Sequence, residues 1–279
     1  MAYKTLLTVV RSSNDAGHQI TAAAQLARQF DAHLDIICIG IDEVQMGYYF
    51  AGADSVLQET SVELAREKAE SLLAQAETLV QGEGVRWSAR GVVSQYGVLS
   101  EVIAQVARFA DLVILPPPYG DSGDTQTEVI LEAVLFAGIA PVLVVPNSGL
   151  STEFPARAVV GWDGSSEALR AARAALPLLN LATQTHVTVV ESEGRHRDGP
   201  EPGQNLCTMF DRQGITAVLD LVPRQKSRVS DVLLDHVAKQ GADIMVIGAY
   251  GHSRFREAIL GGATRELLER ATVPLLLAH

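Results

Sequence analysis

Short apolar runs alternate with longer amphipathic segments along the whole chain. The first apolar run, residues 6–10, precedes an alanine-rich segment of helical periodicity at 20–30, and the alternation continues to the end. We expect further strands at 34–39, 85–91, 111–115, 141–146, 158–161, 186–190, 217–222, 243–247 and 273–277. We expect further helices at 56–80, 98–109, 129–136, 168–179, 207–213, 229–240 and 265–270. Strands that alternate with helices predict a parallel sheet covered on both faces.

The order of the elements is repeated once. The strand and serine-rich turn at 158–166 match the opening of the chain, and the strand that begins at Asp243 matches the one at Asp111. The first copy is the longer one, with its extra residues in the loop at 41–55 and the helix that follows. We therefore predict two α/β units, residues 1–150 and 155–279, each a doubly wound, mostly parallel five-stranded sheet of Rossmann-like type.

Candidate chemistry is concentrated near the C-terminus. An apolar run at 244–247 enters the glycine-rich stretch 248–264, and an amphipathic segment leaves it. A strand, a glycine loop and a helix start are an arrangement that offers backbone N–H groups and a helix N-terminus to an anion. We interpret the stretch as a phosphate-binding loop. The alternative is that its glycines serve only tight turns and close packing.

Composition and charge narrow the classes of partner. The chain is 47% hydrophobic and 20% charged, and its net charge of −11 argues against nucleic acid and anionic membranes as partners. Its start does not resemble a signal peptide, and no apolar stretch approaches the ~20 residues that span a membrane. Cys38 and Cys207 are far apart, which is typical of reduced structural thiols. These features predict a cytoplasmic protein.

The repeated unit resembles the universal stress protein family, and the whole chain resembles a tandem member with two fused units. The most specific element is the family's nucleotide signature, in which Gly248, Gly251 and Gly261 have the expected spacing. This sequence departs from the pattern at Gly262, where the family usually has serine or threonine, although Thr264 supplies a hydroxyl nearby. Losing the first hydroxyl removes a hydrogen bond of about 1 kcal/mol.

The resemblance implies an adenine nucleotide alpha hydrolase-like fold that binds ATP or another adenine nucleotide, with or without Mg²⁺, in the second unit only. Backbone N–H groups of Gly262 and Ala263 would remain available to the phosphates. The family's aspartate at the end of the first strand, near the adenine and ribose, corresponds to Asp163. The first and fourth strands of such a sheet are neighbours, so their following loops meet in one crevice. A helix cap is the alternative role for Asp163.

The first unit lacks these features, so we expect its nucleotide site to be degenerate. Val10 is placed where Asp163 stands in the second copy, and prolines 116–118 occupy the start of the signature. Proline has no N–H donor, and the carboxylates of Asp121 and Asp124 would repel phosphate. Residues 132–134, Glu-Ala-Val, replace the later glycine–serine step.

Two functions from different classes remain. In the first, the protein is a stress-response module that binds the nucleotide and acts through conformation or protein partners, with at most weak ATP hydrolysis. In the second, it is a nucleotide-independent interaction protein whose glycine loop is structural. We identify no catalytic residue, and the histidines show no metal-ligand spacing. The apolar last strands, 142–145 and 275–277, are expected to pair as an intramolecular pseudo-dimer, while association into a homodimer stays open.

Overall fold

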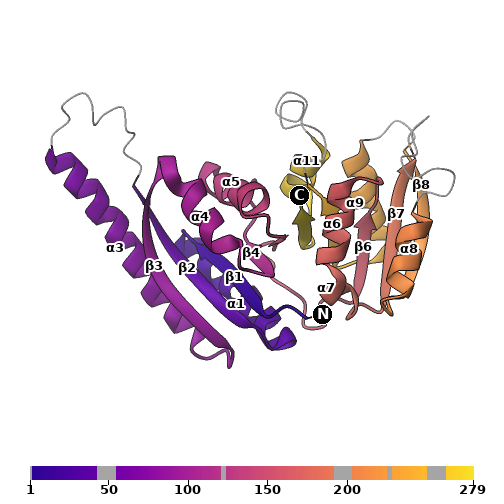
Figure 1. The fold of residues 1–279 in the computed structure, drawn as a ribbon, viewed down its shortest axis with the longest axis horizontal. Helices are drawn as coiled ribbons and strands as arrows, with labels where there is room; N and C mark the ends of the chain where they lie inside the picture. Colours follow the sequence, from indigo (N-terminus) through magenta and orange to yellow (C-terminus); the bar gives the residue numbers. More distant parts are fainter. Residues whose placement is uncertain (1, 43–54, 121–123, 192–202, 225–227, 250–261) are drawn as a thin grey trace.

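Ten strands in the described part of the chain form one continuous sheet with helices on both faces (Figure 1). The computed structural model describes residues 2–42, 55–120, 124–191, 203–224, 228–249 and 262–279. The strand order is β3-β2-β1-β4-β5-β10-β9-β6-β7-β8. Each half of the chain thus contributes five strands, and the predicted α/β class with a mostly parallel sheet is confirmed.

The N-terminal half contains β1 (Thr5–Val10), α1 (Ser13–Phe30), β2 (His33–Asp42), α3 (Ser55–Val80), β3 (Arg86–Gln95), η1 (Tyr96–Val98), α4 (Leu99–Ala107), β4 (Leu112–Leu115), α5 (Thr125–Glu132), the π-helix η2 (Ala133–Ala137) and β5 (Val142–Val144). The C-terminal half contains β6 (Arg157–Gly161), α6 (Ser166–Ala174), α7 (Leu176–Leu179), β7 (Gln184–Glu191), α8 (Gln204–Asp211), β8 (Ala217–Pro223), α9 (Val229–Gln240), β9 (Ile244–Gly248), α11 (Ala263–Arg270) and β10 (Leu275–Ala278).

The two halves meet at their last strands. All neighbouring strands within each half are parallel, whereas β5 and β10 pair antiparallel, with Leu276 opposite Leu143. These strands are fully apolar and buried, so pairing them removes two edges that would otherwise expose unpaired backbone groups. The predicted pairing of the two copies through these strands is present.

Alternation along the strands divides the interior into two layers. On one face, Leu6, Val10 and their equivalents pack under α1, α3, α6, α7 and α8. On the other, Leu7, Val9 and their equivalents pack under α4, α5, η2, α9 and α11. Apolar side chains on both faces explain why the central strands are continuous hydrophobic runs.

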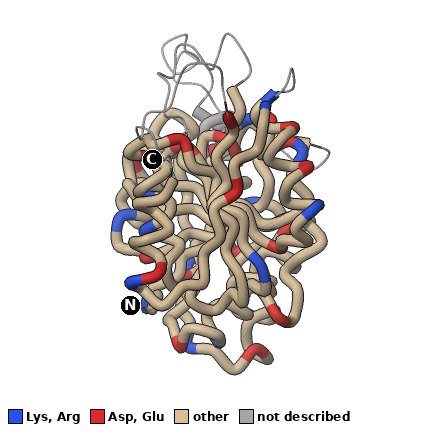
Figure 2. The backbone as a smooth tube through the Cα atoms, turned by 90° about the vertical axis from the view of Figure 1, so that its right-hand side faces the viewer, with Lys and Arg blue, Asp and Glu red and all other residues tan. Residues whose placement is uncertain are grey.

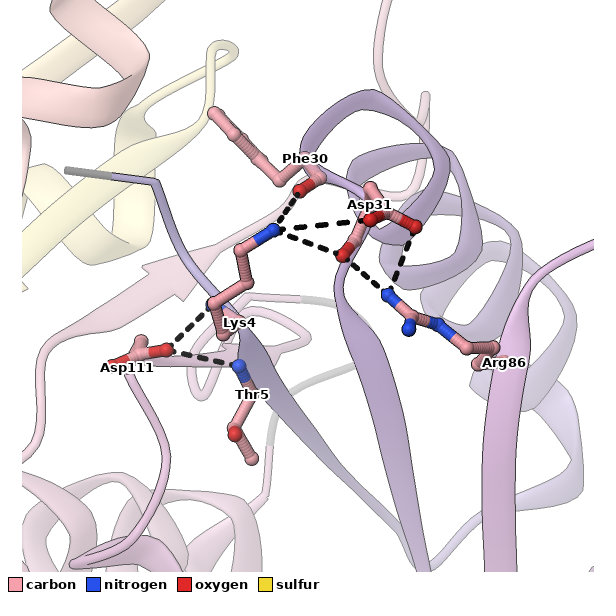
Figure 3. A network of polar contacts seen from close by, with 6 residues as sticks. All are labelled: Lys4, Thr5, Phe30, Asp31, Arg86 and Asp111. Carbon is pink, nitrogen blue, oxygen red and sulfur yellow. Dashed lines mark hydrogen bonds and ion pairs between the residues drawn. The ribbon is translucent and has the colours of Figure 1, made fainter.

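An aspartate at the start of the fourth strand fixes the first strand in each half. Asp111 accepts hydrogen bonds from the backbone N–H groups of Lys4 (2.6 Å) and Thr5 (2.9 Å), next to the polar network of Asp31 and Arg86 (Figure 3). Asp243 accepts equivalent bonds from residues 156 and 157 at 2.9–3.0 Å. The repeated contact gives a structural register between the halves, in which Thr5 corresponds to Arg157.

Two predicted elements differ in detail. The helix expected at 168–179 is divided into α6 and α7, because the proline in the first turn of α7 has no N–H to continue the α6 ladder. The helix expected at 129–136 begins earlier, at Thr125, and ends as a π-helix. The loop predicted within 41–55 lies largely outside the described residues.

Side chains also join the halves. The Tyr3 hydroxyl donates a hydrogen bond to the carbonyl of Ala174 (2.6 Å). The Phe136 and His279 rings pack edge to face, with their centroids 4.6 Å apart. Viewed from the side of β8, acidic and basic residues are interspersed rather than gathered into one patch (Figure 2). Among the described helices, none has the length and apolar character needed to cross a membrane.

Candidate functional site

The candidate site lies where the strand order changes direction, between β6 and β9. The chain leaves β6 for β7 on one side, while β9 pairs with β6 on the other, as expected from the sequence. Val160 is opposite Val246, so Asp163 and Ala249 each lie three residues beyond a paired position. The carboxyl ends of neighbouring parallel strands form a crevice at such a point.

Asp163 is exposed and supports the start of α6. Its Oδ1 accepts a hydrogen bond from the backbone N–H of Ser165 (3.0 Å), and the Ser165 side chain in turn accepts from the N–H of Ala168 (3.1 Å). The N-cap of α6 is therefore Ser165, and Asp163 binds the cap residue rather than the helix itself. The Asp163 carboxylate remains exposed beyond the end of β6.

Gly248 has a packing reason to be glycine. A Cβ at this position would lie 2.4 Å from the backbone nitrogen of Ala168 and 2.7 Å from the carbonyl carbon of Glu167. The first turn of α6 therefore touches the end of β9 directly. The next residue, Ala249, is fully buried, and its N–H donates to Ala278 (2.8 Å) while its carbonyl is bound by His279 Nδ1 (3.0 Å).

The helix that follows the signature begins without a side-chain cap. Gly262 is the N-cap of α11 in an extended conformation (φ −64°, ψ 154°) and offers no side-chain acceptor. Ala263 is exposed, and Thr264 is buried. The first N–H groups of a helix have no intrahelical acceptor, and Gly262 supplies none from a side chain. Gly251 and Gly261 lie outside the described residues.

The structural register corrects the comparison with the first half. Since Thr5 corresponds to Arg157, the residue equivalent to Asp163 is Arg11, not Val10 as the sequence predicted. Arg11 is ion-paired with Asp124, and its Nε donates to the Thr127 hydroxyl at 2.8 Å. A cation therefore stands in the first half where the second half has a carboxylate.

The start of helix α5 in the first half already has a side-chain cap. Asp124 is the N-cap of α5, and its Oδ1 accepts from the N–H of Thr127 (2.8 Å). By the same register, Pro116 takes the place of Gly248. The helix N-terminus, the aspartate position and the glycine position all differ between the halves.

Three further polar residues come together on the opposite side of β6 from β9. His186 on β7, Asp220 on β8 and His236 on α9 gather around one carboxylate oxygen. Their spacing in the sequence gives no indication of the cluster, since 34 residues separate the first two and 16 the last two. The one available signal is a histidine inside a predicted buried strand.

The two thiols carry no evident reactivity. Cys38 is buried and Cys207 is half-buried, and both are free. Burial, with a smaller contribution from Glu77, raises the pKa of Cys38 to about 11. Burial is also the main cause of a raised pKa at Cys207. Protonated thiols are poor nucleophiles, which agrees with structural roles.

Comparison with known proteins identifies the relatives of the chain. Residues 224–279 match the model of the universal stress protein family. A universal stress protein of Synechocystis sp. is 22% identical over 230 residues, which cover 79% of this chain and 75% of the relative. The structure of a universal stress protein from Archaeoglobus fulgidus is 15% identical and covers 98% of this chain and 95% of its own, with a TM-score of 0.74. A universal stress protein solved in complex with cAMP is 22% identical, covers 45% of this chain and 97% of its own, and has a TM-score of 0.36.

Proposed function

We propose that this chain, which is similar to universal stress proteins, is a stress-response module of that family and binds an adenine nucleotide in its C-terminal half. The ligand is ATP or a related adenine nucleotide, with or without Mg²⁺, in the crevice beyond β6 and β9. The N-terminal unit, residues 1–150, binds no nucleotide in this proposal. Binding changes the conformation of the protein or its affinity for protein partners.

The contrast between the two helix starts carries the proposal. Gly262 leaves the first turn of α11 without a side-chain cap, whereas Asp124 caps α5 and would repel a phosphate. A helix N-terminus attracts anions through both hydrogen bonding and the helix dipole. The spacing of Gly248, Gly251 and Gly261 in the sequence agrees with this use of α11.

Asp163 supplies the complementary half of the recognition. Its exposed carboxylate accepts hydrogen bonds, which suits the donors of a nucleoside, namely the ribose hydroxyls and the adenine amine. At the equivalent position Arg11 offers only donors and is already paired with Asp124. The ligand is therefore oriented with its nucleoside toward Asp163 and its phosphates toward α11.

A nucleotide-independent interaction protein is the second candidate, and a specific observation favours it. Gly248 is required by the contact with α6 whether or not a ligand binds, and both backbone polar groups of Ala249 are occupied by the C-terminal residues. In this alternative the glycine loop is retained for packing. Only a binding measurement separates the two functions.

Thermal unfolding of the full chain with ATP–Mg²⁺, AMP or no nucleotide provides the test. A ligand that binds only the folded protein stabilises it by about 2.7 kcal/mol at a concentration 100 times Kd. We expect Asp163→Asn to reduce the affinity by on the order of 10-fold or more, because a charged acceptor is lost. We expect Gly262→Ser to increase the affinity by roughly 5-fold, through one added hydrogen bond of about 1 kcal/mol.

Asp211→Asn is the matched control, because Asp211 is an exposed aspartate at the end of α8. It should leave the nucleotide response unchanged. An unaltered unfolding temperature for the wild-type protein at millimolar ATP and AMP would contradict the proposal and favour the second candidate. A nucleotide response equal in the wild type, Asp163→Asn and Gly262→Ser would place the ligand elsewhere.

A further inference from the structure

Two histidines and an aspartate from three different elements converge in the C-terminal half. Asp220 Oδ2 lies 2.8 Å from His186 Nδ1 and 2.8 Å from His236 Nε2. All three of these ligand-type atoms lie within 4.8 Å of one another. Within the described parts of the chain this is the one cluster of three such groups.

Burial makes this cluster different from a surface ion pair. The two histidines are only 5% and 7% exposed, whereas the Asp220 side chain keeps 21% of its surface accessible on the edge strand β8. One carboxylate oxygen thus serves two buried rings, and the same carboxylate faces the solvent. This geometry provides both a preformed ligand set and a route of entry for a small ion.

A buried hydroxyl beside the cluster has no partner. Thr188 is directly opposite Asp220 in the β7–β8 register and is two residues from His186, so it shares their face of the sheet. Its side chain is fully buried, and its Oγ1 makes no hydrogen bond with the described residues. An unpartnered hydroxyl next to a carboxylate is well placed to bind a metal ligand or a metal-bound water.

The first half lacks the cluster although it has the same strands. The β1–β2 register places Asp35 where β7 has His186, and the β2–β3 register places Arg90 where β8 has Asp220. Helix α4, the counterpart of α9, contains no histidine. The arginine would repel a cation, so the cluster is not a requirement of the fold itself.

We propose that His186, Asp220 and His236 form a binding site for one Zn²⁺ ion. Two imidazole nitrogens and a carboxylate oxygen are ligands that Zn²⁺ prefers, and water would complete a tetrahedral set. In the metal-free protein His186 Nδ1 and His236 Nε2 donate to Asp220 Oδ2. On binding, these nitrogens and Oδ2 bond to the metal instead, and each ring changes tautomer, releasing the proton from its metal-bound nitrogen and carrying one on its other nitrogen. The site shares no residue with the nucleotide crevice, so either can exist without the other.

Metal titration of the chelator-treated full chain tests the proposal without any nucleotide. Co²⁺ replaces Zn²⁺ as a spectroscopic probe, and we expect one Co²⁺ per chain with visible absorption bands that Zn²⁺ abolishes. Removing a direct ligand in Asp220→Asn or His236→Gln should weaken Zn²⁺ binding by on the order of 100-fold. Asp220→Asn keeps the size and an acceptor oxygen of the aspartate, and far-UV circular dichroism verifies that each variant is folded.

His33→Gln is the matched control, because His33 lies 3.5 Å from Asp35 in the first half, where no third histidine, cysteine or carboxylate of the described residues joins them. It should leave the stoichiometry and the affinity unchanged. X-ray absorption of the Zn²⁺-loaded wild-type protein should reveal two imidazole ligands, independently of any variant. Failure of the wild type to bind Co²⁺ or Zn²⁺ at micromolar concentration, unchanged affinity in folded Asp220→Asn, or fewer than two imidazoles would each overturn the proposal.

Discussion

The two halves of the molecule share a fold but use the same position beyond the first strand in opposite ways. In the N-terminal half, Arg11 reaches helix α5 and is ion-paired with its cap, Asp124. In the C-terminal half, the exposed Asp163 accepts from the N–H of Ser165, and α11 starts at Gly262 without a side-chain cap. One half caps its helix start with an aspartate, and the other has glycine at the cap position. The two halves therefore share the sheet but differ in the polar groups at its rim.

The halves also differ in the contacts between their helices and the ends of their strands. The backbone of α6 touches Gly248 in the second half, whereas the first half has Pro116 at the equivalent place. On the outer face, α9 and α11 are linked by ion pairs, such as Arg270 with Asp231 and Arg228 with Glu266. The first half has instead apolar packing of α4 against η2.

The largest expected effect comes from breaking the close approach at Gly248. Gly248→Ala adds a Cβ that would lie 2.4 Å from the backbone nitrogen of Ala168, so the α6 backbone must move. We expect a loss of about 1–3 kcal/mol in the free energy of unfolding, as for other overpacked sites. Chemical denaturation of the nucleotide-free protein measures it.

Gly91→Ala on β3 is the control for that substitution, since its Cβ would make an ordinary contact of 3.7 Å with Ala69. It should be close to neutral. If Gly248→Ala were equally neutral, packing would not explain this glycine, and the ligand-binding role would gain weight.

We expect a smaller loss in the free energy of unfolding when the ion pair between Arg11 and Asp124 is removed. Arg11→Ala, Asp124→Asn and the double variant form a double-mutant cycle, in which Asp124→Asn keeps an acceptor for the Thr127 N–H. The Asp124 side chain is 39% exposed, so solvent screening limits the coupling energy to about 1 kcal/mol. Additive losses of stability across the cycle would mean that the pair does not hold the α5 start.

The smallest effect concerns the ion pair between α9 and α11. The hydrogen bond from Arg270 is the main cause of a lowered pKa at Asp231, whose ordinary value is 3.8. A lowered pKa in the folded state contributes stability above the ordinary value, and that contribution is lost as the pH falls through the folded pKa. Wild-type protein should therefore lose more stability than Asp231→Asn on acidification from about pH 6 to about pH 3. Parallel stability curves for the two proteins would exclude this role of the pair.

Much of the fold was predictable because it depends on local patterns. Apolar runs such as 112–115 and 244–247 are buried on both faces, so a parallel strand is the structure that suits them. The apolar last strands of the two halves, β5 and β10, would be exposed sheet edges if unpaired, and they pair with each other. The site was less predictable. Comparison of the two halves by sequence aligns Val10 with Asp163, one residue short of Arg11, because in the structural register the second half has one more residue before its helix cap.

The sequence by itself determined the repeat, the α/β class, the pairing of β5 with β10 and the location of a signature in one half only. Hydrophobic periodicity and glycine spacing are local properties of the sequence, so they can be recognised without knowing the tertiary contacts. Only the tertiary structure decided that the backbone of α6 constrains Gly248, and that Arg11 is ion-paired with the N-cap of α5. It alone brought together His186, Asp220 and His236, because residues on β7, β8 and α9 become neighbours only when strand register and helix packing are fixed.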